Sequence, residues 1–343
     1  MSDSNNVTVA CVGAGYFSQF HYEAWDRHPD TQVIASADKS LEKAEQTNAI
    51  KAYSSISDML NDKVPDILDI ITPPTSHLNS ITDAVKHDIK IIVCQKPFCT
   101  SIEEAKRAIA LADAANIDLV IHENFRFQPW FRVMKKAIDT GLVGRVLQLS
   151  FRLRTGDGQG ENAYLDRQPY FRRMPKLLMH ETGVHYIDTF QYLLGYADNI
   201  YADLRTLNPV IQGEDAGFVL LGYEDGKRAL LDGNRLLDHD TENTRLTFGE
   251  ANLEGTLGEI NLHGNGAVSL RHCGSTSRTI LLEPKSWPGF AGDCVYALQE
   301  HLVSALLHKT PLENLARDYL RIMTQVDMIY RSAAAGTRIQ VSK

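Results

Sequence analysis

The first third of the chain alternates short apolar runs with amphipathic stretches, and this alternation limits the possible folds more than any other feature. Five runs have the length and composition of buried strands, and they span residues 7–13, 32–38, 66–72, 90–96 and 118–124. Strands that alternate with helices are typical of parallel sheets joined by crossover helices. The sequence therefore predicts an α/β domain built on a doubly wound parallel sheet.

The pattern changes near residue 128, where an antiparallel architecture begins. We expect an amphipathic helix over 129–140 and then a long strand over 144–154. Two dipeptides favour the tight primed turns that join antiparallel strands; they are Asp225-Gly226 and Asn265-Gly266. This part of the chain is therefore expected to be α+β, with a mostly antiparallel, open-faced sheet.

Two long helical patterns close the chain, over 293–309 and 315–336, the second ending at Gly336. A single hydrophobic core rarely grows beyond roughly 250 to 300 residues, so a chain of 343 residues is expected to form two domains. We place them at residues 1–126 and 127–343, the first for a nucleotide and the second for the substrate and for oligomerisation.

Composition and charge argue against several classes of protein. The net charge of −8 and the lack of a basic tract disfavour nucleic acid as a partner. No apolar run has the length of a membrane span and the N-terminus does not resemble a secretion signal, so we expect a cytoplasmic protein without a membrane partner. The cysteines lack metal-type spacing, so we expect free, buried thiols and no metal site; they are Cys11, Cys94, Cys99, Cys273 and Cys294.

The first strand leads directly into a glycine turn, Gly13-x-Gly15-x-x-Ser18. In a dinucleotide-binding (Rossmann) fold the first glycine allows the tight turn, and the second lets a pyrophosphate approach the backbone at a helix N-terminus. Ser18 replaces the usual third glycine, and a Gly-x-Gly turn alone is a weak signal. The other turn residues expected at the cofactor are Ala14, Tyr16 and Phe17.

Asp38 ends the second strand, where an acidic side chain selects the cofactor. A carboxylate there can accept both ribose hydroxyls of NAD and repel an added phosphate. The alternative is that Asp38 caps the helix that follows. The ammonium group of Lys39 could tolerate a 2′-phosphate, so NAD is favoured and NADP stays open.

Thr72, Pro73 and His77 follow the third apolar run, in “IITPPTSH”. Loops at the carboxyl ends of parallel strands form the ligand crevice, so these residues are expected to line the cofactor groove. Their alternative roles are a strand terminator at Pro73-Pro74 and a helix cap at Ser76 or His77, and both are compatible with that position.

Lys96 ends the next apolar run at the same edge, between Gln95 and Pro97. Pro97 restricts the backbone of Lys96 to extended values, which aims the side chain in one direction. The alternative is a surface lysine whose stem covers apolar area. We favour a functional lysine, because a polar neighbour, a rigid proline and the nucleotide crevice coincide.

The segment “MHETGVHYIDTF” contains histidines that do not fit a zinc helix. His180 and His185 are five residues apart, about 140° around a helix, so they cannot share a metal from one face. Glu181 and His185 are four residues apart and share a face, so the carboxylate can orient the imidazole. The alternative is a capping glutamate beside a core histidine.

Together these motifs resemble the Gfo/Idh/MocA oxidoreductase family, which includes inositol dehydrogenases and glucose-fructose oxidoreductase. The Gly-x-Gly turn, Asp38, “TPPTSH”, “QKP”, “HENFRFQP” and “ETGVHYIDTFQYLLG” occur in the family's order over nearly the whole chain. Gln95 departs from the family's usual glutamate before the lysine, which removes a charge near the nicotinamide.

The resemblance also implies roles for single residues. Lys96 matches the family's catalytic lysine, which contacts nicotinamide and substrate. His185 would be the general base, with Glu181 orienting it or binding a substrate hydroxyl. Asn124 and Arg126 match a segment near the nicotinamide and the substrate. The polar segment after residue 153 adds three substrate-binding candidates, Arg154, Asp157 and Tyr164. The alternative is that this segment is a solvated loop without a binding role.

The resemblance implies an NAD-dependent dehydrogenase that acts on a hydroxyl of a sugar, cyclic polyol or sugar acid. Lys96 and His185 are expected to converge on one alcohol carbon. The resemblance also implies a homodimer or homotetramer, in which subunits pair through the open face of the antiparallel sheet. Two alternatives stay open: an NAD-dependent glycosidase that uses transient oxidation, and a non-catalytic regulator that senses a dinucleotide or sugar.

Overall fold

The computed structural model describes residues 6–341, which form two compact units. The first unit extends to Asn124 and includes Cys294–Arg321, and the second comprises Phe125–Asp293 and the chain from Ile322 on. The first unit thus ends two residues before the boundary drawn from the sequence. It also contains a segment that the sequence prediction placed in the second domain, because a helical pattern does not show against which sheet a helix packs.

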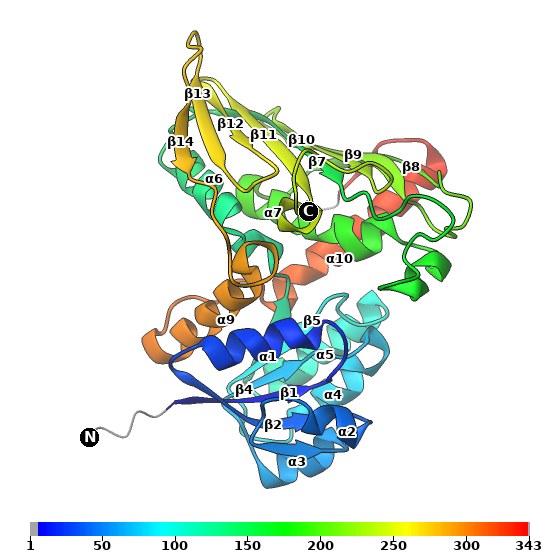
Figure 1. Ribbon diagram of the computed structural model, residues 1–343, viewed down its shortest axis with the longest axis vertical. Helices are drawn as coiled ribbons and strands as arrows, with labels where there is room; N and C mark the ends of the chain where they lie inside the picture. Colours follow the sequence, from blue (N-terminus) through cyan, green and yellow to red (C-terminus); the bar gives the residue numbers. More distant parts are fainter. Residues whose placement is uncertain (1–5, 342–343) are drawn as a thin grey trace. The chain divides into compact units, whose positions relative to one another are not determined.

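The first unit contains a six-stranded parallel sheet (Figure 1, blue to cyan). Its order is β3-β2-β1-β4-β5-β6, as a doubly wound fold requires. The strands are β1 (Val7–Val12), β2 (Thr31–Ala37), β3 (Lys51–Tyr53), β4 (Ile67–Ile70), β5 (Ile91–Gln95) and β6 (Asp118–His122). All residues of β4 and β5 are buried, because parallel sheets are covered on both faces. The predicted Rossmann sheet is confirmed.

Helices connect these strands and close the unit. The connecting helices are α1 (Ser18–Arg27), α2 (Leu41–Glu45), α3 (Ile56–Asp62), α4 (His77–Ala84) and α5 (Ile102–Ala114), with a 3-10 turn η1 (Pro74–Ser76) before α4. A further helix, α9 (Phe290–His308), has positive φ angles at Ala291, Gly292 and Asp293. The chain enters the first unit again directly after this irregular turn, at Cys294.

The strand order reverses between β1 and β4, and ligands bind to doubly wound sheets at this switch point. Gly13 lies there with a φ of +109°, and a Cβ on it would come within 2.6 Å of the carbonyl oxygen of Ile71. Only glycine therefore fits, since both the backbone angle and the contact exclude a side chain.

The second unit contains a nine-stranded sheet in the order β14-β13-β12-β11-β7-β10-β9-β8-β15. All neighbours are antiparallel except β7 and β10. The strands are β7 (Val146–Arg154), β8 (Asn199–Arg205), β9 (Ala216–Gly222), β10 (Arg228–Asn234), β11 (Gly249–Gly255), β12 (Gly258–Leu262), β13 (Val268–His272), β14 (Thr279–Leu282) and β15 (Ile339–Gln340). Both predicted turns join antiparallel strands, with positive φ at Gly226 and Gly266.

One face of this sheet packs on helices and the other is open. The helices, seen in Figure 1, are α6 (Pro129–Asp139), α7 (Val184–Leu194) and α10 (Ala316–Ala335). Gly336 follows α10 directly with a positive φ, as the predicted glycine stop requires. Phe151 of β7 stacks on Tyr186 of α7 with 4.0 Å between ring centroids. Tyr201 and Phe218 are about two-fifths exposed. Pairing of two copies of the chain through the open face stays a prediction.

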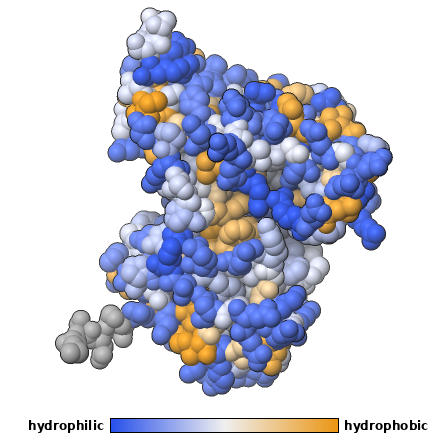
Figure 2. Space-filling view, viewed as in Figure 1, coloured by the Kyte–Doolittle hydropathy of each residue, from blue (hydrophilic) through white to orange (hydrophobic). Residues whose placement is uncertain are grey.

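The surface in Figure 2 is mostly hydrophilic, with scattered hydrophobic residues. Single exposed apolar side chains are normal for globular proteins. Over residues 6–341, no helix combines the length and the hydropathy that a membrane crossing needs.

Candidate active site

The glycine turn and Asp38 lie in contact at the carboxyl edge of the parallel sheet. The amide of Ala14 donates to Asp38 Oδ2 at 2.8 Å, and the amide of Ser40 donates to Asp38 Oδ1 at 2.9 Å. Asp38 therefore supports the turn before α2, and Ser40 is the N-cap residue. A Cβ on Gly15 would have no heavy atom within 4 Å, so space is open beside the turn. These residues fit a dinucleotide, with room for its pyrophosphate and a carboxylate for its ribose.

Ser18 supports the turn in place of a third glycine. Its hydroxyl donates to the carbonyl of Gly15 at 2.6 Å, and α1 begins at this residue. Among the other predicted cofactor residues, Tyr16 is half exposed and Lys39 is exposed. Asn124 is buried, and its amide donates to Cys294 Sγ at 3.2 Å. Their contacts with the cofactor stay predictions.

The turn after β4 is held from beneath by His77. Its Nε2 donates to the carbonyl of Thr72 at 2.6 Å, while Ser76 Oγ donates to Thr72 Oγ1 at 2.7 Å. Burial lowers the pKa of His77 to about 4, so its ring is neutral at physiological pH. Pro73 beside it is exposed. His77 thus supports the backbone of Thr72. That Thr72, Pro73 and His77 line the cofactor groove stays a prediction.

Lys96 is attached to a buried chain of hydrogen bonds through Gln95. The amide of Lys96 donates to Gln95 Oε1 at 2.8 Å, and Gln95 Nε2 donates to His21 Nε2 at 3.1 Å. The other ring nitrogen of His21 donates to Asp69 Oδ2 at 2.8 Å, and the indole of Trp25 donates to the same oxygen at 2.9 Å. The Lys96–Pro97 peptide bond is cis. The backbone at Lys96 is therefore fixed from within the sheet.

This chain of bonds explains why glutamine suits position 95. Its amide group donates to one ring nitrogen of His21, so the proton of the other nitrogen is directed at Asp69. A glutamate could only accept, and it would need a second proton on His21. His21 and Asp69 were missed in the sequence. For His21 the available signal was its helical spacing with three other buried residues of α1, Ser18, Tyr22 and Trp25, which share one helix face.

In the second unit, Glu181 lies in a π-helix, Leu178–Gly183, which leads directly into α7. The sequence prediction assumed a regular helix here. Such π turns are rare and occur frequently at functional sites. Glu214 holds the start of the turn, because its carbonyl accepts from the amide of Leu178 at 2.9 Å and its Oε1 accepts from the amide of Met179 at 3.1 Å. Over residues 6–341, no three His, Cys, Asp or Glu side chains lie together in a group that could hold a metal ion.

His185 is the second residue of α7, and its ring is held by an aromatic stack. The ring lies 4.0 Å from that of Phe125, with an interplanar angle of 10°. Phe125 belongs to a 3-10 turn, η2 (Phe125–Phe127), and its ring also contacts that of Phe248. His185 is 7% exposed. The stack fixes the plane of the imidazole, which a general base requires.

The two arginines proposed for substrate binding each pair with an aspartate. Arg126 binds Asp188 of α7 through two nitrogens, at 2.8 and 2.5 Å. Arg154 donates to the carboxylate of Asp232 at 2.6 Å and to its carbonyl at 2.8 Å. These pairs join η2 to α7 and β7 to β10. Contacts of both arginines with a substrate stay predictions.

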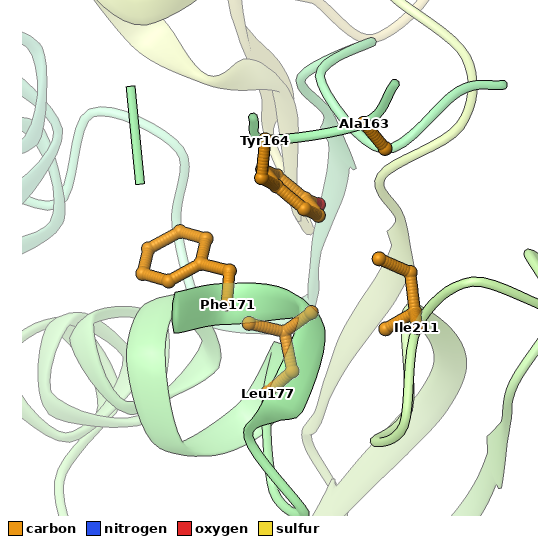
Figure 3. Close-up of a cluster of buried hydrophobic side chains, with 5 residues drawn as sticks. All are labelled: Ala163, Tyr164, Phe171, Leu177 and Ile211. Atoms are coloured by element: carbon orange, nitrogen blue, oxygen red, sulfur yellow. The ribbon is translucent and has the colours of Figure 1, made fainter. Parts of the chain in front are cut away.

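Asp157 and Tyr164 lie in a folded segment that packs on the sheet. Both are hydrogen-bonded to Arg235, at 2.8 Å each. Tyr164 belongs to the buried hydrophobic cluster drawn in Figure 3, whose members are Ala163, Tyr164, Phe171, Leu177 and Ile211. A solvated loop, the alternative considered from the sequence, does not describe Tyr164. Contacts of Asp157 and Tyr164 with a substrate stay predictions.

Comparison with known proteins adds the following findings. The family model described as “Oxidoreductase family, NAD-binding Rossmann fold” matches residues 7–122, and “GFO/IDH/MocA C-terminal domain” matches residues 131–260. D-Apiose dehydrogenase of Paraburkholderia graminis is 26% identical over 345 aligned residues, which cover 97% of this chain and 89% of that protein.

Two solved structures are similar over almost their whole length. The crystal structure of an oxidoreductase from Agrobacterium radiobacter, in complex with NAD+, L-tartaric acid and magnesium, is 25% identical with a TM-score of 0.86 and covers 98% of each chain. A levoglucosan dehydrogenase in complex with NADH and levoglucosan is 19% identical, with a TM-score of 0.83, and covers 98% of this chain and 100% of the other. The second of these likenesses shows the shared fold alone.

Proposed function

Since the chain belongs to the GFO/IDH/MocA oxidoreductase family and has its NAD-binding Rossmann domain, we propose that it is an NAD-dependent dehydrogenase acting on a carbohydrate-like hydroxyl. The substrate class is a sugar, a cyclic polyol or a sugar acid, and the reverse reaction reduces the matching ketone. One observation carries the proposal: Lys96 follows a parallel strand at the nucleotide-binding edge, with its backbone fixed by the buried Gln95–His21–Asp69 chain.

The proposed catalytic residues have different tasks. NAD, when bound, supplies the hydride acceptor. His185 takes the hydroxyl proton of the substrate, and a positioned base contributes typically about 10²- to 10⁴-fold. Glu181 orients the imidazole or binds a neighbouring hydroxyl. The ammonium group of Lys96 stabilises the negative charge that develops on the same oxygen.

Three findings bear on the substrate class. The relative from Paraburkholderia graminis is named for a sugar, D-apiose, which supports a sugar or polyol. Arg126 and Arg154 are paired with carboxylates of the protein, so their attraction for an acidic substrate is reduced. The Agrobacterium radiobacter protein was solved with L-tartaric acid, a hydroxy acid, which keeps sugar acids in the proposal.

A substrate panel tests this function. The purified protein is incubated with sugars, cyclic polyols and aldonic acids, with NAD and NADP in parallel, and reduced cofactor is followed by absorbance. We expect at least one compound to give reduced cofactor and the oxidised product in equal amounts. Release of a leaving group from aryl glycosides without net NADH would instead identify a glycosidase. Binding of NAD without any turnover would identify a sensor.

Replacing Asp38 with serine is expected to weaken the binding of NAD but not that of NADP. The variant loses the carboxylate proposed to accept the ribose hydroxyls, and lost hydrogen bonds to a charged group amount to about 1.5–3 kcal/mol, or roughly 10- to 100-fold in affinity. The KM for NAD should rise by about that factor, while the KM for NADP should stay constant or fall. Lys39→Ala is the matched control, because it removes only the neighbouring cation. An unchanged NAD to NADP ratio in Asp38→Ser would contradict the assignment.

A further inference from the structure

Arg235 is a buried cation between three polar partners of the second unit. It follows β10 directly and is 3% exposed. Its Nε donates to the hydroxyl of Tyr164 at 2.8 Å, Nη1 to Thr182 Oγ1 at 2.7 Å and Nη2 to Asp157 Oδ2 at 2.8 Å. All three guanidinium nitrogens are therefore engaged, in the fixed fork geometry that makes arginine a rigid connector.

These bonds join segments that are far apart in the sequence. Asp157 and Tyr164 belong to the segment after β7, and Thr182 belongs to the π-helix. The main chain adds to the junction, since the carbonyl of Arg235 accepts from the amide of Gly158 at 2.9 Å. The rings of Tyr164 and Phe171, seen in Figure 3, lie 5.3 and 5.4 Å from the guanidinium carbon. We call Arg235 and its three side-chain partners, Asp157, Tyr164 and Thr182, the Arg235 clamp.

The opposite charges of Arg235 and Asp157 stabilise the clamp, and the carboxylate of Glu181 also acts on Arg235. Burial is the largest effect on Asp157 and by itself would raise the pKa of this carboxyl. The charges of Arg235 and Arg167 and the hydrogen bonds from Thr155 and Arg235 together lower the pKa below its usual value, so the carboxylate stays ionised. Burial would lower the pKa of Arg235, whereas Asp157, Tyr164 and, to a smaller extent, Glu181 raise it. The charge of Glu181 also raises the pKa of Tyr170, after the larger effect of burial. Glu181 is thus close enough for its charge to act on the clamp.

We propose that Arg235 is a positioning residue for Glu181, which it holds in place through Thr182. This inference rests on the proposed function, because it gives Glu181 a task beside His185. Thr182 adjoins Glu181 in the π-helix, and its β-branched side chain has few rotamers, so a bond at its hydroxyl restrains the backbone of the turn. A displacement of a catalytic group by about 1 Å can cost roughly 10²-fold in rate.

Thr182→Val tests the proposal with the smallest change. Valine has nearly the same shape but no hydroxyl, and the bonds of Arg235 to Asp157 and Tyr164 remain possible. We expect kcat and kcat/KM to fall together by about 10-fold, as for a loss that acts in the transition state. Thr182→Ser keeps the hydroxyl and should retain kcat within about 3-fold.

Arg271→Met is the control for general loss of an arginine–carboxylate pair in the same unit. Arg271 binds Glu259 at 2.8 Å between β12 and β13, so its loss should affect the melting temperature more than kcat. Amide hydrogen exchange over residues 178–183 gives a readout that needs no substrate. Exchange there should be faster in Thr182→Val and unchanged in Thr182→Ser.

Two results would overturn the positioning role. One is a Thr182→Val enzyme with the kcat of the unmodified protein, and the other is equal exchange over residues 178–183 in all three proteins. If the unmodified protein oxidises nothing in the substrate panel, the proposed function fails, and the exchange experiment still decides whether Arg235 fixes the π turn. The two failures are therefore distinguishable.

Discussion

Lys96→Met is expected to lower kcat/KM for the oxidised substrate by about 10²- to 10³-fold, the usual effect of removing one group that stabilises an oxyanion. Methionine keeps an unbranched, apolar stem and removes the ammonium charge. Affinity for NAD, measured by fluorescence titration, should change much less, because the glycine turn and Asp38 remain. Steady-state kinetics with the best substrate of the panel gives the ratio of kcat/KM between the unmodified protein and the variant.

Lys90→Met is the matched control for this variant. Lys90 immediately precedes β5, at the end of the strand opposite to Lys96, and it pairs with Asp66 at the surface. Exposed pairs of this kind contribute about 0–1 kcal/mol, so its activity should stay near that of the unmodified protein. If Lys96→Met turns over substrate as fast as Lys90→Met, Lys96 has no catalytic role.

His185→Gln is expected to lower kcat by about 10²- to 10⁴-fold, because glutamine cannot take a proton from the substrate hydroxyl. The remaining activity should rise with pH, since hydroxide or an already ionised alcohol then replaces the missing base. The stack on Phe125 is also lost, so the variant should be compared at a temperature where it stays folded. The measurement is kcat as a function of pH for both proteins.

His272→Gln serves as the control for the histidine variant. His272 is exposed at the end of β13 in the same unit. It is far from the π-helix in sequence, and three strands separate β13 from β10, the strand that contacts the π-helix. It should keep the kcat and the pH profile of the unmodified protein. A His185→Gln enzyme that keeps them as well would exclude His185 as the base.

The fold could be predicted from local patterns, because strand and helix periodicities and turn residues are local properties. The glycine turn and Asp38 appear in the predicted order, and both Asp225-Gly226 and Asn265-Gly266 lie in turns between antiparallel strands, as predicted. The turn type differs from the expected primed turn, because φ is positive at Gly226 and Gly266 but not at Asp225 or Asn265. The strand β3 was missed because three residues, Lys51–Tyr53, are too short for a period to be visible. The assignment of Cys294–Arg321 to the first unit depends on long-range packing that no local pattern encodes.

The site was predicted less well, because its supporting contacts connect distant parts of the chain. His21 lies 48 residues from Asp69 and 74 from Gln95. Arg235 lies 53 residues from Thr182 and 78 from Asp157. Glu181 and His185 were named from their spacing, whereas the π turn that carries Glu181 is set by Glu214 and by the clamp. Sequence spacing thus indicates which residue types lie near each other on one element, and tertiary contacts decide how they are held.

Gln95 is a second case in which the sequence identifies a residue and a tertiary contact explains it. The resemblance identified glutamine in place of the family's glutamate and predicted the loss of a charge. The structure adds the physical reason, since only an amide can donate to the nitrogen of His21 while its oxygen accepts from the amide of Lys96. A local difference in sequence is therefore matched to a buried partner 74 residues away.

In the proposed reaction, Lys96 and His185 act on one substrate hydroxyl. A crystal structure of the protein with NADH and the best substrate of the panel tests it most directly. We predict that Lys96 Nζ and a ring nitrogen of His185 each lie within about 3.2 Å of the same hydroxyl oxygen, on the carbon that faces the nicotinamide. Either nitrogen lying more than about 6 Å from that oxygen, well beyond hydrogen-bond reach, would contradict the claim.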